Sequence, residues 1–76
     1  MNEKYLMLVF YKEDGYHVCH SLATHILFCA ESQEEAKTEC LGMIETHWKN
    51  AKKYGVLNLF YRAAPKEYFD KYGDQL

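Results

Sequence analysis

The segment Lys4–Tyr11, KYLMLVFY, is the feature that most constrains the fold, because it reads as a strand that is apolar on both faces. Side chains alternate along a strand, so one face carries Tyr5, Met7, Val9 and Tyr11, and the other carries Leu6, Leu8 and Phe10. A strand of this kind needs cover on both sides, from the same chain or from a partner.

A meander of three antiparallel strands is predicted from this first strand onward. Asp14-Gly15 lies between two apolar runs and is a strong hairpin signal. The second strand is then Tyr16 to about Ser21, and a looser turn falls near Leu22–Thr24. The third strand is about His25–Cys29.

One long amphipathic helix follows, over roughly Gln33–Tyr54. Ser32 and Glu35 form the pattern of a capping box at its start, and Gly55 suits its C-terminal cap. Gly42 in mid-helix is unfavourable by about 1 kcal/mol relative to Ala. We therefore expect Gly42 to mark close packing of the helix on the sheet.

The remaining residues predict a fourth strand, Val56–Arg62, and a short helix that begins at Pro65. Tyr68, Phe69 and Tyr72 would form the apolar face of that helix. The predicted fold is α+β in the order β-β-β-α-β-α, with a three- or four-stranded antiparallel sheet crossed by the long helix. Because the chain has only 76 residues, we expect residues 1–76 to form a single domain.

Charge and cysteine content argue against several classes of protein. The net charge of −2 does not favour nucleic-acid binding through a broadly basic surface. Three cysteines are an odd number, whereas a small secreted domain usually carries an even set. No signal peptide and no apolar run of membrane-spanning length is visible. We expect a cytoplasmic protein with reduced thiols and no membrane contact.

The stretch Tyr16–Cys29 holds three of the four histidines and two of the three cysteines, which raises the question of a metal site. The candidate zinc ligands are His17, Cys19, His25 and Cys29. Their spacings fit no common metal pattern, and cysteine is also a good small core residue. A structural role is therefore expected, with no cofactor, and a zinc-binding module is kept as an alternative.

An enzyme is not expected. The three aspartates fall in a turn and at the tail, and glutamates gather at the helix start, where the macrodipole favours them. This arrangement does not suggest the converging carboxylates of a two-metal nuclease. A nucleic-acid-binding accessory protein is a further alternative, and it would present Lys49, Lys52, Lys53 and Arg62 on one exposed face.

Aromatic residues make up 16% of the chain, more than one helix can cover. The sheet face away from the long helix needs the C-terminal segment or a second subunit. We expect a homodimer or higher homo-oligomer. The candidate residues of a partner interface are Tyr5, Tyr11, Phe60, Tyr61, Tyr68 and Phe69.

The hairpin KEDGYHV and the helix start AESQEEA, with the strand order above, resemble the HicB-like antitoxin domain. Glu31, Ser32, Glu34, Glu35 and Ala36 match that family's G-D-T-x-E-E-A pattern, with Ala30 in place of Gly. The resemblance covers about residues 4–60. The segment SLATHI departs from it, since it keeps only Leu22 of the family's P-x-L-P-G-C segment.

The resemblance implies a partial ribonuclease-H-like fold without nuclease activity. It also implies a non-enzymatic protein-binding function, in which an antitoxin neutralises a small basic ribonuclease toxin or acts as a self-associating regulator. Many members carry a further DNA-binding segment. Residues 63–76 here are too short for a helix-turn-helix and are not basic, so the tail gives no support for DNA binding.

Overall fold

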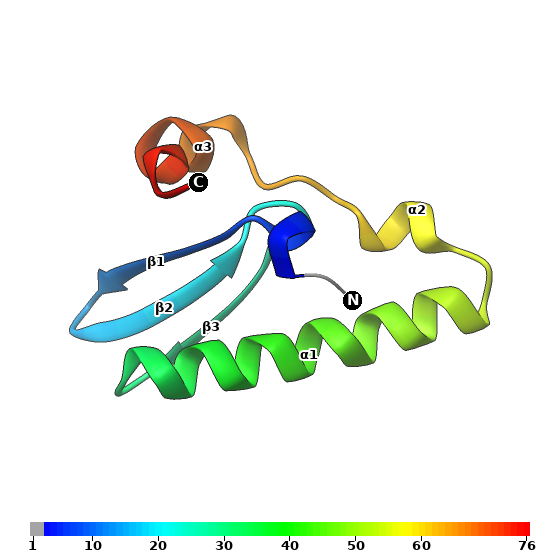
Figure 1. Ribbon diagram of the computed structural model, residues 1–76, viewed down its shortest axis with the longest axis horizontal. Coiled ribbons are helices and arrows are strands. Elements are labelled where there is room, and N and C mark those ends of the chain that lie inside the picture. The colour runs from blue at the N-terminus through cyan, green and yellow to red at the C-terminus, as the bar shows by residue number, and fades with distance from the viewer. Residues whose placement is uncertain (1–2) are drawn as a thin grey trace.

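The computed structural model describes residues 3–76, which fold as a three-stranded antiparallel sheet with a long helix packed on it (Figure 1). The strands are β1 (Leu8–Glu13), β2 (Tyr16–Ser21) and β3 (Ile26–Ala30), and the helices are α1 (Gln33–Lys53), α2 (Leu57–Phe60) and α3 (Lys66–Tyr72). Short 3-10 turns lie at Glu3–Leu6 and Gly73–Gln75. The predicted α+β class is confirmed. No helix of the described range is long and apolar enough to cross a membrane.

The Asp14-Gly15 turn sets the register of the first hairpin. Both residues have positive φ, 52° and 82°, as a two-residue type I′ turn requires. Glu13 therefore pairs with Tyr16, and the ladder runs on to Leu8 opposite Ser21. The predicted second strand is confirmed to the residue, and the third lies one residue later than predicted.

The first strand is shorter than predicted, because its start is a 3-10 turn and not extended chain. Met7 has a φ of 56°, which breaks the strand before Leu8. The carbonyls of Leu6 and Met7 instead accept hydrogen bonds from Ala23 and Leu22 of the β2–β3 loop. Packing on that loop therefore overrides the strand preference of residues 4–7.

Helix α1 begins and ends as its capping residues predict. The Oγ of Ser32 accepts a hydrogen bond of 3.2 Å from the N–H of Glu35, and Gly55 takes a φ of 68° just after the helix. The expectation for Gly42 is wrong: an added Cβ would meet no atom within 4 Å, so no close packing requires a glycine there.

Two apolar clusters lie on opposite faces of the sheet, which forms the middle layer between α1 and α3 (Figure 1). The first cluster joins Cys19 of the sheet to Cys40 and Ile44 of α1. The second is built on Val9 and Leu22, against which Tyr68, Phe69 and Tyr72 pack. The C-terminal segment thus supplies the second cover that the first strand required.

The predicted fourth strand is wrong, since residues 57–60 form one helical turn, α2, and the sheet has three strands in the described range. Phe60 is only 6% exposed and completes the cluster beneath α1. A short apolar run has no decisive local preference, and burial of Phe60 selects the helical turn. The chain then crosses the end of the sheet, held by a 2.8 Å hydrogen bond from Ala64 N–H to Leu22 O.

Candidate functional site

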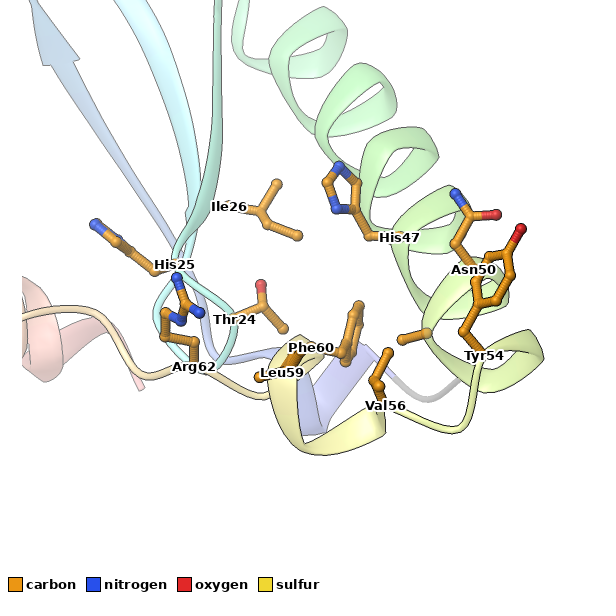
Figure 2. A pocket seen from close by; sticks show the side chains of 11 residues that line it. Thr24, His25, Ile26, His47, Asn50, Tyr54, Val56, Leu59, Phe60 and Arg62 are labelled. Carbon is orange, nitrogen blue, oxygen red and sulfur yellow. The ribbon is translucent and has the colours of Figure 1, made fainter.

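A pocket of about 390 Å³ opens between the β2–β3 loop, the last turns of α1 and α2 (Figure 2). Its walls hold Thr24, His25, Ile26, His47, Asn50, Ala51, Tyr54, Val56, Leu59, Phe60 and Arg62. Figure 2 shows His47 projecting from α1 toward Ile26, with Phe60 standing between the walls. Arg62 lies on the loop side, beside Thr24 and His25. The pocket therefore combines an apolar floor with a cationic wall.

A hydrogen-bonded chain of three side chains runs from the rim of this pocket into the α3 side of the sheet. The hydroxyl of Tyr11 lies 3.0 Å from Nδ1 of His20, and Nε2 of His20 lies 2.9 Å from Nδ1 of His25. A neutral His20 has one N–H donor and one acceptor nitrogen, so the donors all point one way along the chain or all point the other. The chain thus couples His25, at the surface, to Tyr11 beneath α3.

His20 is held neutral in this chain. Burial, and then the neighbouring His25, lower the pKa of His20 to about 4. The ring of Tyr68 from α3 packs edge-on against it at 4.8 Å, and Tyr72 stacks on Tyr11 at 4.2 Å. Burial also raises the pKa of the Tyr11 phenol, so that phenol stays protonated.

The two edge strands of the sheet, β1 and β3, differ in the hydrogen bonds that their outward-facing backbone groups make. At the β1 edge, the side-chain amide of Gln75 accepts from Phe10 N–H at 2.8 Å and donates to Phe10 O at 2.7 Å. These are the two hydrogen bonds that Phe10 would exchange with a residue of another strand. At the β3 edge, within residues 3–76, the backbone meets only a weak 3.7 Å contact of the Cys40 thiol with Ile26 O. The β3 edge is therefore open.

The open edge carries none of the usual protection against pairing. Strand β3, ILFCA, has no charge and no proline. Leu27 and Cys29 face away from α1 and are exposed, since α3 covers the other strands on that side. Beyond the strand, four exposed carboxylates form no ion pair with another described residue: Glu31, Glu34, Glu35 and Glu39.

The six predicted interface residues do not form one surface. Tyr11, Tyr68 and Phe69 meet in the cluster beneath α3, and Phe60 is buried beneath α1. Tyr5 and Tyr61 are exposed at separate places, 66% and 50% respectively. The exposed apolar side chains near α2 are instead Tyr54, Leu57, Leu59 and Tyr61.

The four predicted zinc ligands do not converge. His17 and Cys19 lie on the α1 face of β2, whereas Cys29 lies on the opposite face of β3. The Nδ1 of His25 is occupied by His20. Among the residues that the structure describes, no group of three or more His, Cys, Asp or Glu side chains could hold a metal ion.

The buried cysteines are packed side chains and not exposed nucleophiles. Cys19 and Cys40 are fully buried and free, and they face each other across the α1–sheet interface. Hydrogen bonding to Cys19, and then burial, raise the pKa of the Cys40 thiol well above its usual range. A protonated thiol away from solvent is a poor nucleophile, which applies to Cys40. The same hydrogen bond lowers the pKa of Cys19, whose side chain is shielded from solvent.

The four basic residues of the predicted nucleic-acid face do not share one environment: three lysines lie on α1 outside the pocket, and Arg62 lines it. Lys49 pairs with Glu45 at 3.1 Å, and Lys52 lies over the Trp48 ring. Lys53 lies over the Tyr54 ring, and none of the three lysines lines the pocket. Arg62 alone of this set does.

Two residues of the candidate site, His20 in the hydrogen-bonded chain and Gln75 at the β1 edge, are not among the predicted site residues. The signal for His20 was present, because the hairpin register places Val9 opposite His20 and Tyr11 opposite Val18, which makes Tyr11 and His20 diagonal neighbours on one face. No local pattern signals Gln75, since its partner Phe10 lies 65 residues away.

Comparisons of the chain with protein-family models, with curated proteins and with solved structures give no match.

Proposed function

We propose that this chain is a non-enzymatic, cytoplasmic protein-binding domain of the HicB-like antitoxin type, which binds a small basic protein at the open β3 edge. The observation that carries the proposal is the contrast between the two sheet edges. Gln75 covers the β1 edge at Phe10, whereas β3 pairs with β2 on one side and, within the described range, has no strand partner on the other. An uncharged open edge is a template for an added strand.

Charge supports a basic partner. Glu31 directly follows β3, and Glu34, Glu35 and Glu39 lie in the first two turns of α1; all four are exposed. A partner strand laid along β3 would bring its flanking residues close to these carboxylates, so lysine and arginine there would speed association and fix its direction. The three free cysteines fit a reducing compartment, where such a complex would form.

A second copy of the chain is the other occupant that this edge favours. Antiparallel pairing of β3 with itself about Phe28 would set Leu27 opposite Cys29, with apolar side chains on both sides. The predicted homo-oligomer would then use the same edge as the toxin, and toxin binding would compete with self-association.

The test is capture of partners by tagged protein from its native lysate, with Leu27→Lys as the edge variant. Leu57→Lys is a matched control, because Leu57 on α2 is 39% exposed and Leu27 is 38% exposed. We expect wild type and Leu57→Lys to retain a small basic protein at near-equal stoichiometry, and Leu27→Lys to lose at least tenfold of it. Equal capture by both variants would remove β3 as the site.

Light scattering on the purified proteins separates the two occupants. A mass of two chains that falls to one chain in Leu27→Lys, but not in Leu57→Lys, supports self-pairing at β3. Where a basic protein is captured, its toxicity on expression and the rescue of growth by wild type, but not by Leu27→Lys, test neutralisation. A captured protein without toxicity would contradict the antitoxin reading while leaving β3 as a binding edge.

A further inference from the structure

The pocket between the β2–β3 loop, α1 and α2 has the size and wall chemistry of a small-molecule site. Its volume of about 390 Å³ lies within the roughly 300–1,000 Å³ of ligand pockets. The chain carries 11 acidic residues, yet none lines this pocket. Its charged wall residue is Arg62, so the field inside favours negative charge.

Arg62 is available for a ligand. Its side chain is exposed and forms no ion pair with any residue of the range 3–76. Its backbone is held in place, since Arg62 N–H donates to Phe60 O at 3.0 Å and Ala64 N–H donates to Leu22 O at 2.8 Å. A guanidinium presents parallel N–H donors that match the two oxygens of a carboxylate or phosphate.

The rest of the wall suits an apolar body and not a bare ion. Ile26, Ala51, Val56 and Phe60 form the floor, and Phe60 stands near the middle of the pocket (Figure 2). His47 projects from the facing helix. A flat or branched hydrocarbon group would lie on Phe60 while its charged end reached Arg62. His25 is left out of the contact set, because its Nδ1 is hydrogen-bonded to His20 and its ring points away from the pocket in Figure 2.

We propose that this pocket binds a small organic anion, a carboxylate or phosphate monoester on an apolar or aromatic body, with Arg62 as the charged contact and Phe60 as the apolar one. The site lies at the C-terminal end of α1, which is basic, and not at its N-terminal end, where Glu34, Glu35 and Glu39 lie. The pocket touches β3 only at Ile26, the first residue of that strand, and its charged contact Arg62 lies outside β3. A ligand here and a protein partner along β3 can therefore be tested with different variants.

The experiment is a titration of the ¹⁵N-labelled full chain followed by amide chemical shifts. The probes are benzoate, phenyl phosphate, inorganic phosphate and neutral benzamide. We expect benzoate or phenyl phosphate to shift the amides of residues 24–26, 47–51 and 56–62 with saturation in the millimolar range or below. Benzamide and inorganic phosphate should bind at least tenfold more weakly, because each lacks one half of the recognised group.

Arg62→Gln is the test variant, and Lys53→Gln is its charge-matched control, because Lys53 is exposed and does not line the pocket. Arg62→Gln should weaken binding of the anionic probe at least tenfold, and Lys53→Gln should bind as wild type does. Leu27→Lys should also bind normally, which separates this site from the β3 edge.

Four outcomes overturn the proposal. Benzamide binding as tightly as benzoate would show that the negative charge is not recognised. Inorganic phosphate binding as tightly as phenyl phosphate would show that the apolar floor contributes nothing. Absence of saturable shifts with both aromatic anions, or unchanged binding by Arg62→Gln, would remove the site.

Discussion

Lowering the pH below neutrality is expected to destabilise the fold through His20. Its side chain is 0% exposed, and its pKa falls from the ordinary 6.5 to about 4 in the folded chain. The unfolded chain therefore binds this proton more tightly than the folded chain. The stability that neutral His20 contributes is complete above pH 6.5 and is lost as the pH falls from about 6.5 to about 4.

The size of the effect follows from the two pKa values. A tenfold difference in proton affinity corresponds to about 1.36 kcal/mol. Full protonation of His20 therefore lowers the free energy of unfolding by about 3 kcal/mol. About 2 kcal/mol of this is already lost at pH 5. For a domain of this size, a loss of about 2 kcal/mol lowers Tm by roughly 8–16 °C.

The groups that face His20 come from three elements: Tyr11 from β1, His25 from the loop, and Tyr68 from α3. No carboxylate is among these contacts to compensate the added charge. Protonation leaves both ring nitrogens as donors, so His20 can no longer accept at either end of the chain. We expect the packing of α3 on Tyr11 and His20 to loosen first.

The assay is urea denaturation at pH 7.5 and pH 5, for wild type, His20→Gln and His47→Gln. Carboxylates titrate in all three proteins, so the difference between wild type and His20→Gln isolates His20. Wild type and His47→Gln should lose about 2 kcal/mol more than His20→Gln between the two pH values. An equal loss in all three proteins would refute the reasoning that burial of His20 makes the fold sensitive to acid.

Four substitutions test local features by denaturation or sedimentation. Gly42→Ala should raise the free energy of unfolding by about 0.5–1 kcal/mol, because the added Cβ meets no atom. Gly55→Ala should lower it by about 1 kcal/mol, because Gly55 has a φ of 68°. A change of the same sign in both variants would contradict this. Ser32→Ala should cost about 1 kcal/mol by removing the helix cap, and no loss would contradict the capping role. Gln75→Ala frees the Phe10 backbone groups and should cost less than about 1 kcal/mol while raising the concentration-dependent sedimentation mass; an unchanged mass would show that Gln75 does not guard the β1 edge.

The elements with local signals could be predicted from the sequence. Asp14-Gly15 defines the hairpin because both residues tolerate positive φ, and Ser32 with Glu35 defines the start of α1 because a cap acts over three residues. Each signal lies within one turn of the structure that it causes. The register of the first hairpin, and with it the meeting of Tyr11 and His20, follows from the turn alone.

The candidate pocket could be predicted only in part. The basic character of residues 49–62 was visible in the sequence, but the pocket depends on where α2 lies, and α2 was expected to be a strand. Gln75 at the β1 edge depends on a contact across 65 residues. Neither the pocket nor the closed edge has a local pattern that would predict it.

The need for cover on both faces of the sheet could be predicted from local sequence, because the predicted strand Lys4–Tyr11 is apolar on both sides. The sequence left two sources of that cover open, the C-terminal segment and a second subunit, and a homo-oligomer was the expected one. In the folded chain α3 provides this cover by bringing Tyr68 and Tyr72 onto the sheet, and among residues 3–76 no strand pairs with the outer edge of β3. The physical reason is range: turns and caps depend on hydrogen bonds between near neighbours, whereas burial depends on which distant segments the folded chain brings together.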